Sequence, residues 1–306
     1  MAVSYNEAFK RWSENWFQMI LNHPGNDCNK WDGLSANPNL TWKIVQENPD
    51  KSWDWWGLSC NPNITWEIVQ ANPNKPWDWK GLSCNPNITW EIVQANPDKP
   101  WGWKELSCNS NITWEIVQSN PDKLWDWRGV SQNRTITWEI VKANPNNPWR
   151  FGALSYNRNI TWEIIQANPD EPWDWEGVCC NPNITWEIVK ANPDKPWYWS
   201  RLTTNPNITW EIIQENPDKK WEWDYWHRGV SKNPNITWEI VKANPNKRWN
   251  WRGLSYNRMD IAKNAFIRKE LQEQFRKSDL KRELMESFWH PKRMEKFMYL
   301  LKDDDE

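Results

Sequence analysis

Residues 61–84 read Asn-Pro-Asn-Ile-Thr-Trp-Glu-Ile-Val-Gln-Ala-Asn-Pro-Asn-Lys-Pro-Trp-Asp-Trp-Lys-Gly-Leu-Ser-Cys, and this stretch decides the fold because it recurs along the chain. Its threonine returns at Thr41, Thr65, Thr89, Thr113, Thr137, Thr161, Thr185, Thr209 and Thr237. Seven of the eight steps are 24 residues long and the last is 28, so nine copies cover residues 37–258. A degenerate earlier copy stands at residues 31–35. Such repetition predicts a solenoid of stacked units.

Each repeat is expected to form a hairpin of two short helices. Thr65 is a typical N-cap for a first helix, which Asn72 and Pro73 would end because the residue before proline avoids helical backbone. The second helix is expected to start at Asn74, with a proline in its first turn. Neither helix would be stable alone, so stacking of the hairpins must bury their apolar faces.

A β-solenoid is the alternative fold. Ile64, Trp66 and Ile68 alternate with polar residues and are β-branched or aromatic, as in a strand. Two Asn-Pro pairs in each unit, and a threonine cap followed by Glu67, favour helices instead. We therefore predict an all-α chain, an α-solenoid of stacked two-helix repeats with helical caps.

The solenoid is expected to be a rod or gentle superhelix about 80 to 100 Å long, given helix spacings of about 8 to 10 Å. A rod needs closed ends. We assign residues 1–27 to an N-terminal helical cap, residues 28–258 to one partial and nine full repeats, residues 259–302 to a C-terminal helical cap and residues 303–306 to an acidic tail. A four-residue insert, residues 224–227, interrupts the spacing.

The composition fits an ordered protein. The 32 Trp supply the apolar volume that is missing from Leu, Ile, Val and Phe, and the formal net charge is only -2. No signal peptide and no apolar run of membrane-spanning length is visible, so we expect a chain that is neither secreted nor membrane-spanning. The six Cys are not expected to form a disulfide framework, since three of them share one repeat position.

A period of 24 residues turns each repeat position into a column along the array. Two Asn columns never vary, and their amides are expected to form a ladder of hydrogen bonds between turns of neighbouring repeats. The ladder is assigned above all to the Asn that ends the first helix, at Asn48, Asn72, Asn96, Asn120, Asn144, Asn168, Asn192, Asn216 and Asn244. The second column, from Asn37 to Asn233, ends the other half of the unit.

The charged and aromatic columns are expected to be structural. The Glu column that begins at Glu67 is explained by the helix dipole and solvation better than by a cation site or acid-base chemistry. Three Trp per unit, represented by Trp66, Trp77 and Trp79, are expected to fill the core. Alternatively, one Trp column lines a groove and stacks on a partner's rings or bases.

Positions that vary between repeats are better candidates for contact with a partner, because the scaffold does not dictate them. One such column follows the Trp pair and another follows the serine. The candidate partner-binding residues are Trp56, Lys80, Lys104, Arg128, Glu176, Ser200 and Arg252 in the first column, and Gln132, Tyr156, Lys232 and Tyr256 in the second. The units around Arg134, Phe151 and Arg158 also depart from the consensus and could hold a partner-specific patch.

No enzyme motif is visible. The three His lie outside the repeat, and neither a zinc-protease motif, nor a nucleophile elbow, nor a glycine-rich phosphate loop occurs. We expect no catalytic residue, metal, cofactor or small-molecule substrate.

The words Asn-Pro-Asn-Ile-Thr-Trp-Glu-Ile-Val and Asn-Pro-Asp-Lys-Pro-Trp-x-Trp-x-x-Leu-Ser resemble the tryptophan-rich short repeats in proteins of giant and other large DNA viruses. Residues 283–286 and 289–293 resemble the ending that often follows these repeats. The resemblance covers most of residues 28–296. It implies a viral origin and a repeat scaffold in the host cytoplasm or the virus particle, with no activity to carry over.

We therefore expect a non-enzymatic scaffold that binds another macromolecule, first of all a viral or host protein. One alternative is a nucleic-acid-associated protein that uses Trp stacking and the basic segment after residue 258. Another is a structural component of the virus particle. The sequence specifies no oligomeric state and no membrane partner.

Overall fold

The computed structural model describes residues 5–21, 30–223 and 229–277. Every regular element within these ranges is a helix, which confirms the α-solenoid and rules out the β-solenoid. The insert at residues 224–227, the helices expected beyond residue 277 and the acidic tail lie outside the described residues. No described helix is long and apolar enough to cross a membrane.

Each repeat forms the expected pair of short helices, as α5 (Trp66–Ala71) and α6 (Trp79–Cys84) show. The Thr65 hydroxyl caps α5 by accepting a hydrogen bond from the amide of Ile68 at 3.4 Å. The expected start of the second helix at Asn74 is wrong. α6 begins five residues later, where Asp78 caps it by accepting from the amide of Gly81 at 2.7 Å.

The hairpins stand side by side in two layers. The outer layer holds α3 (Trp42–Glu47), α5, α7 (Trp90–Ala95), α9 (Trp114–Ser119), α11 (Trp138–Ala143), α13 (Trp162–Ala167), α15 (Trp186–Ala191), α17 (Trp210–Glu215) and α18 (Trp238–Ala243). The inner layer holds α2 (Lys30–Ala36), α4 (Trp55–Cys60), α6, α8 (Trp103–Cys108), α10 (Trp127–Gln132), α12 (Phe151–Leu154), α14 (Trp175–Cys180), α16 (Trp199–Leu202), the short 3-10 helix η1 (Val230–Lys232) and α19 (Trp251–Tyr256).

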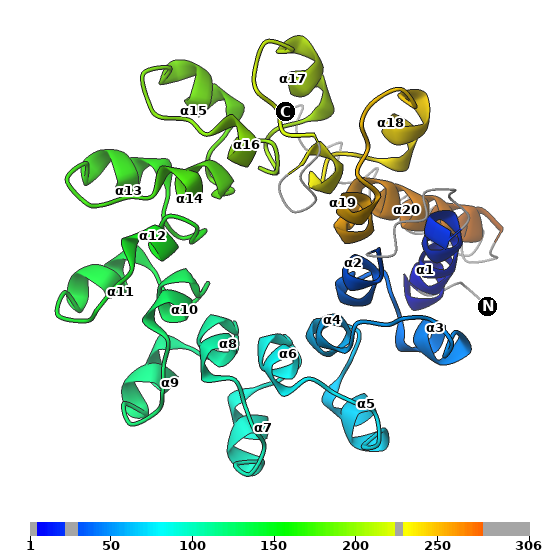
Figure 1. Cartoon of the computed structure of the whole chain (residues 1–306), viewed down its shortest axis with the longest axis horizontal. Coiled ribbons are helices and arrows are strands. Elements are labelled where there is room, and N and C mark those ends of the chain that lie inside the picture. The colour runs from blue at the N-terminus through cyan, green and yellow to red at the C-terminus, as the bar shows by residue number, and fades with distance from the viewer. Residues whose placement is uncertain (1–4, 22–29, 224–228, 278–306) are drawn as a thin grey trace, which may run out of the picture.

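The array closes into a ring, so the expected rod or open superhelix is wrong. Figure 1 shows the inner layer as a closed circle in which α2 lies beside α19. The contact is close, because a Cβ placed on Gly33 of α2 would collide with the hydroxyl of Ser255 of α19. Ten inner segments within the described residues share the full turn, which corresponds to about 36° per unit.

An Asn ladder joins neighbouring repeats, but it is made by the second Asn column. The buried amide of Asn85 donates to the carbonyls of Ser59 and Asn61, at 2.8 and 2.9 Å, in the preceding repeat. Its Oδ1 accepts from the amide of Asn87 at 2.8 Å, and the side chain of Asn87 donates to the carbonyls of Pro62 and Ile64, at 2.8 and 3.0 Å. The two Asn side chains thus supply backbone carbonyls of the preceding repeat, including the buried carbonyls of Ser59 and Ile64, with hydrogen-bond donors.

The column from Asn48 to Asn244, to which the ladder was assigned, serves its own repeat instead. The Asn72 amide donates to the carbonyl of Ile68 at 2.8 Å, one turn back in α5. The backbone carbonyl of Asn72 accepts from the Trp77 indole at 2.9 Å. This column therefore terminates the outer helix and fixes the following turn.

The same ladder closes the ring. The Asn37 amide donates to the carbonyls of Ser255 and Asn257, at 2.8 and 3.1 Å, and the Asn39 amide donates to the carbonyl of Arg258 at 2.8 Å. Asn37 thus bonds to the last full repeat in the same way that each of the other ladder Asn residues bonds to the repeat before it. Met259 stands two residues after Asn257, where Asn87 stands relative to Asn85. It adopts a left-handed φ of 48°, and the chain leaves the ring there.

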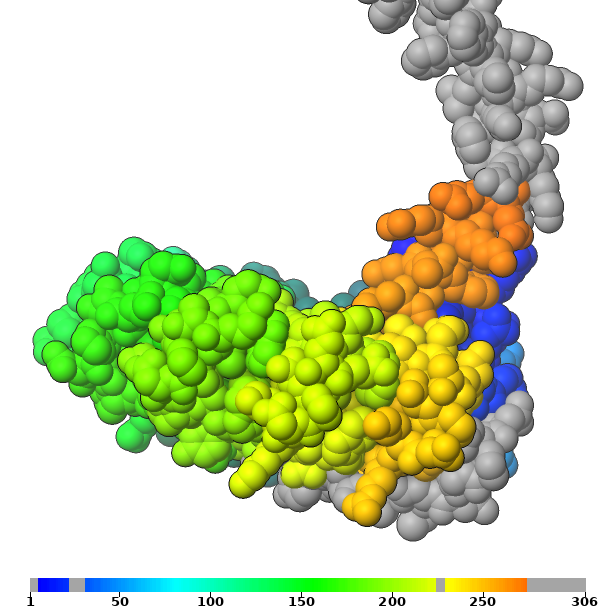
Figure 2. Space-filling view, turned by 90° about the horizontal axis from the view of Figure 1, so that it is seen from above, coloured from blue at the N-terminus to red at the C-terminus, as the bar shows by residue number. Residues whose placement is uncertain are grey.

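The two flanking helices do not cap opposite ends. α1 (Tyr5–Leu21) and α20 (Asp260–Lys277) pack on each other at the ring junction, where Arg11 pairs with Glu270 at 2.7 Å. Figure 2 shows both helices together at one side of the ring. α1 takes the place of a missing outer helix. Its buried Phe17 stacks on Trp53, and in the other repeats a Trp of the outer helix makes this contact, as Trp66 does with Trp101 of the next repeat.

Tryptophans fill the space between the two layers, as predicted. Trp90 of α7 contacts Trp103 of α8 at 6.4 Å and Trp125 of the next repeat at 5.9 Å, and Trp103 meets Trp125 edge to face at 5.3 Å and 86°. The Trp125 indole also donates to the Asn120 carbonyl at 2.8 Å. Such triads recur around the ring and bury large apolar surfaces in favourable ring geometry.

Small residues let the inner helices approach closely. A Cβ on Gly81 would lie 2.8 Å from both the Cβ of Ser59 and the carbonyl oxygen of Trp56 in α4. The hydroxyl of the fully buried Ser59 accepts from the backbone amide of Asp78 at 3.0 Å. Close inner helices and wider outer helices give the array its curvature.

Candidate functional site

The inner face is the side of the inner helices that points away from the outer layer. In α6, Trp79 and Leu82 pack into the core between the two layers. Successive helical residues turn by about 100°, so Lys80 and Cys84 lie on the opposite side of the helix. The inner helices surround the centre of the ring, so this side faces the centre (Figure 1).

Both variable columns that the sequence singled out lie on this inner face. Trp56 is 49% exposed there. Four more of the predicted residues are exposed, namely Lys80, Lys104, Arg128 and Gln132. The other six are half-buried, namely Glu176, Ser200, Arg252, Tyr156, Lys232 and Tyr256. The structure therefore brings the sequence candidates to one surface, although it divides them into an exposed and a half-buried group.

Four residues of the half-buried group contact other side chains of the ring. The Nε of Arg201 on α16 donates to Glu176 of α14 at 2.8 Å. Arg252 of α19 pairs with Asp32 of α2 across the junction. The Lys232 ammonium lies 5.1 Å from the centre of the Tyr256 ring, and burial lowers the pKa of this lysine.

Arg201 and Asp32, which complete two of these pairs, were not among the predicted site residues. Arg201 occupies the position that is Gly in most units, and Asp32 belongs to the degenerate first copy. A charge in a column of glycines was the available signal for Arg201. Nothing in the sequence alone brings Asp32 next to Arg252, because their contact depends on ring closure.

The exposed group forms an unbalanced patch of positive charge. Lys80, Lys104 and Arg128 stand on the successive inner helices α6, α8 and α10, and none of them has an ion-pair partner among the described residues. Arg134 and Arg158, both exposed, follow in the turns after α10 and α12 and likewise have no ion pair within the described ranges. We call these five residues the basic arc.

One carboxylate, that of Glu105, lies at the start of α8 beside the basic arc. In α8, Gly102 replaces the Asp that caps most inner helices, and Glu105 replaces the glycine three residues later. A Cβ on Gly102 would collide with the Glu105 carboxylate, so that carboxylate occupies the space of the missing Asp side chain. The exchange keeps a negative charge at the start of the helix, where the dipole favours it.

Thiols stand next to the basic arc. The five described cysteines are free, and Cys60, Cys84 and Cys108 occupy equivalent inner-face positions. Partial desolvation raises the pKa of Cys108, whose side chain is still exposed, to about 11, and burial raises the pKa of Cys179 to about 12. Because a thiol reacts as its thiolate, these two side chains are weak nucleophiles near neutral pH.

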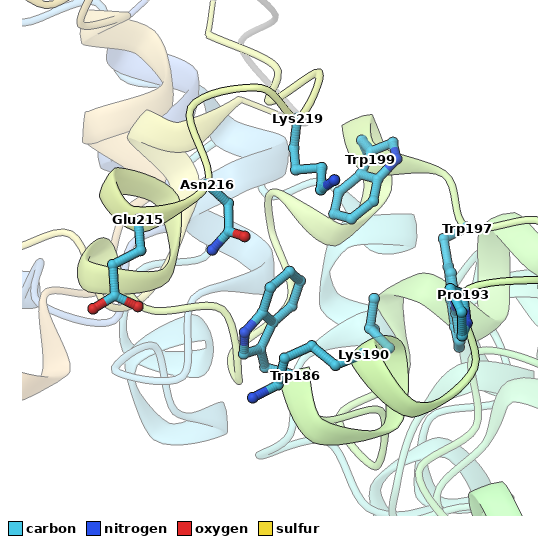
Figure 3. Close-up of a pocket in the computed structure, with 9 residues that line it drawn as sticks. Trp186, Lys190, Pro193, Trp197, Trp199, Glu215, Asn216 and Lys219 are labelled. Carbon is cyan, nitrogen blue, oxygen red and sulfur yellow. The ribbon is translucent and has the colours of Figure 1, made fainter.

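Grooves between successive outer helices form a second, repeated surface. Figure 3 shows one of about 520 Å³ between α15 and α17, with Trp186, Trp197 and Trp199 on its walls and Lys219 beside Trp199. The Lys219 ammonium lies 5.3 Å from that indole ring. Grooves of about 410 and 300 Å³ are lined by equivalent residues of other repeats. The Trp-lined groove considered from the sequence therefore exists, but the chain's own Lys occupies part of it.

The described residues contain no group of three or more His, Cys, Asp or Glu side chains placed to hold a metal ion. Comparison of the chain with family models, with curated proteins and with solved structures finds no match.

Proposed function

We propose that this protein is a non-enzymatic, ring-shaped scaffold that binds a polypeptide partner at its inner face. One observation carries the proposal: two columns that vary between repeats lie together on the inner face, while the Asn, Ser and Trp columns around them are nearly constant. A scaffold that keeps its packing residues and varies one surface is typical of repeat proteins that bind macromolecules.

A nucleic-acid-associated function has less support. The sequence suggested it through Trp stacking and the basic segment after residue 258, yet the Trp of the repeat columns pack against one another in triads. Trp56 is the one strongly exposed indole in the described part of the chain. A role in the virus particle and a viral origin stay predictions, which proteomics of purified particles would test.

The experiment is affinity capture from native host cells with the full chain and two matched variants. The inner-face variant carries Trp56→Ser, Cys108→Ala and Gln132→Ala, three exposed positions on α4, α8 and α10. The control carries Gln70→Ala, Gln94→Ala and Gln118→Ala, three exposed positions on α5, α7 and α9. We expect a protein that wild type and control retain equally and that the inner-face variant loses.

Equal retention by the inner-face variant would contradict the proposal, as would loss of the partner in the control alone. Nuclease treatment of the lysate adds a second readout. If it removes the captured protein from the wild-type ring, the contact is made through nucleic acid and the protein-binding function is wrong.

A further inference from the structure

We infer that the basic arc is a docking site for an acidic polypeptide segment. The inference rests on the proposed function and specifies the chemistry of the partner. Lys80, Lys104 and Arg128 place three exposed cations on three neighbouring helices of the inner face, and Arg134 and Arg158 add two more at the adjoining turns. Carboxylates are the polypeptide groups that pair with such cations.

The rest of the inner layer shows that unpaired charge is the exception. Beyond α12, the cations of the inner helices already have partners: Arg201 has Glu176, Arg252 has Asp32, and Lys232 lies over Tyr256. The carboxylate of Glu105 lies at the start of α8, near the Lys80 side chain, but pairs with none of the described cations of the basic arc, so the arc keeps an excess of positive charge. Only the basic arc leaves several cations of the inner face for a molecule from outside, among the residues that the structure describes.

The surroundings favour a short acidic peptide over a polyphosphate. The whole chain has a net charge of -2, and the outer layer carries a column of exposed carboxylates from Glu67 onward. A long polyanion would meet this repulsion, whereas a short segment on the inner face would not. Proteins that hold single-stranded nucleic acid also offer a series of aromatic platforms, and the inner face offers one exposed indole, Trp56.

The residues beside the basic arc indicate which kind of side chain flanks the acidic residues in the partner segment. Trp56 lies on α4, next to α6, and presents apolar surface at one end of the arc. Gln132 on α10 supplies a hydrogen-bonding amide near Arg128. We therefore expect an acidic segment flanked on one side by an apolar or aromatic residue.

The test measures binding of three labelled probes to the full chain by fluorescence anisotropy at low salt. The probes are a hexaglutamate peptide, a hexaglutamine peptide and a hexathymidylate oligonucleotide. We expect hexaglutamate to bind, to lose affinity steeply as salt rises, and to bind more tightly than either other probe. The triple variant Lys80→Gln, Lys104→Gln and Arg128→Gln should weaken hexaglutamate binding by about tenfold or more.

The matched control removes three charges from the outer layer. Lys142→Gln, Lys190→Gln and Lys242→Gln neutralise three exposed lysines on α11, α15 and α18 and should change the affinity by less than about twofold. The charge-preserving variant Lys80→Arg with Lys104→Arg should bind like wild type. All substituted side chains are exposed, so the thermal unfolding transition should stay in place and serves as the folding control.

Each contrary outcome has a distinct meaning. No binding of hexaglutamate, or equal loss in the inner and outer variants, overturns the acidic-segment proposal. If partner capture still depends on the inner face in that case, the proposed function stands without it. If hexathymidylate binds more tightly than hexaglutamate and the inner variant loses it, the site is a nucleic-acid site and both proposals are wrong.

Discussion

The interface between two ordinary repeats and the junction that closes the ring are built from the same contact. In the body of the ring, the Asn85 amide reaches carbonyls 24 and 26 residues earlier in the chain. At the junction, the Asn37 amide makes equivalent bonds to residues 218 and 220 positions later. The last repeat therefore meets the first through the same ladder contact by which any repeat meets its neighbour.

The two interfaces differ in how the chain supports them. Ordinary repeats are covalently adjacent, whereas the junction closes a loop of more than 200 residues, and the entropy lost on closure grows with the logarithm of loop length. The junction has additional contacts that the body lacks, since α1 packs on α20 and Trp12 lies 5.6 Å from Phe266. These contacts offset the missing covalent link.

The largest effect should come from breaking the ladder in the body. Asn133→Ala removes an amide that donates to the carbonyls of Ser107, Asn109 and Ile112, at 3.1, 2.8 and 3.0 Å. The buried Ser107 carbonyl would lose this donor, and the Thr135 amide would lose Asn133 Oδ1, which accepts from it at 2.9 Å, so the free energy of unfolding should fall by about 3 kcal/mol. Urea denaturation followed by circular dichroism measures this change.

The same substitution at the junction sharpens the comparison. Asn37→Ala should open the ring between α2 and α19 before the body unfolds, which raises the radius of gyration in X-ray scattering and speeds amide exchange in those two helices. A loss of global stability equal to that of Asn133→Ala, with no local opening, would show that the junction and the body unfold as one unit.

A smaller effect is expected from three glycine substitutions that probe close packing. Gly33→Ala at the junction and Gly81→Ala in the body each force a Cβ against the neighbouring inner helix and should destabilise by about 1 to 3 kcal/mol. Gly152→Ala is the control, since its Cβ would meet only the Cβ of Asp174 at 3.8 Å, and it should be neutral or slightly stabilising. Thermal unfolding of the three variants gives the comparison, and equal shifts would refute the role of close inner packing.

The smallest effect is a pH dependence that differs between the two regions. In the body, the Glu67 carboxylate accepts hydrogen bonds from the Thr65 hydroxyl and from the backbone amide of Glu67, and these bonds lower its pKa below the ordinary value of 4.5. The pKa values of Glu91 and Glu115 are lowered in the same way. A carboxyl with a lowered pKa in the folded state stabilises the fold above its unfolded pKa. It loses that contribution as the pH falls below about 4.5.

At the first repeat, Lys43 replaces the glutamate and bonds to Glu14 of α1 at 3.0 Å, which raises the pKa of Lys43 above 10.5. This contribution is present at neutral pH and is lost as the pH rises through that raised pKa. The midpoint of urea denaturation of a triple variant should therefore approach that of wild type at pH 3, the variant carrying Glu67→Gln, Glu91→Gln and Glu115→Gln. A Lys43→Gln variant should approach wild type only as the pH rises above 10.5, because the pKa of Lys43 is raised above that value in the folded state. These groups are exposed, so the differences should shrink in high salt.

The hairpin could be predicted from the sequence because its determinants are local. The threonine cap of α5 and the Asn-Pro stop act within one helical turn, and the structure confirms both. The start of α6 was misplaced because Asn74 and Asp78 are both suitable caps. Only the hydrogen bonds that the Asn72 carbonyl accepts from Lys75 and Trp77 show that the intervening residues form a turn.

The ladder and the ring depend on geometry that accumulates over many repeats. Two Asn columns are equally constant, so their sequence could not show that Asn85 bonds to the preceding repeat while Asn72 bonds within its own. Closure follows from a rotation of about 36° repeated ten times, and a small error in that angle separates a ring from an open superhelix. The sequence singled out the two variable columns, but their shared orientation toward the centre of the ring could not be predicted from it, because that orientation depends on ring closure.

The closed ladder also makes repeat number a fixed quantity for this chain. A straight or open solenoid grows by duplication of a unit, because a new repeat only moves its end outward. Here an eleventh inner segment would require every interface to turn by about 33° instead of about 36°, or else the Asn37 bonds to Ser255 and Asn257 would separate. Duplication or loss of a single 24-residue unit would therefore disrupt the whole circle, so the number of copies is constrained together with the sequence of each one.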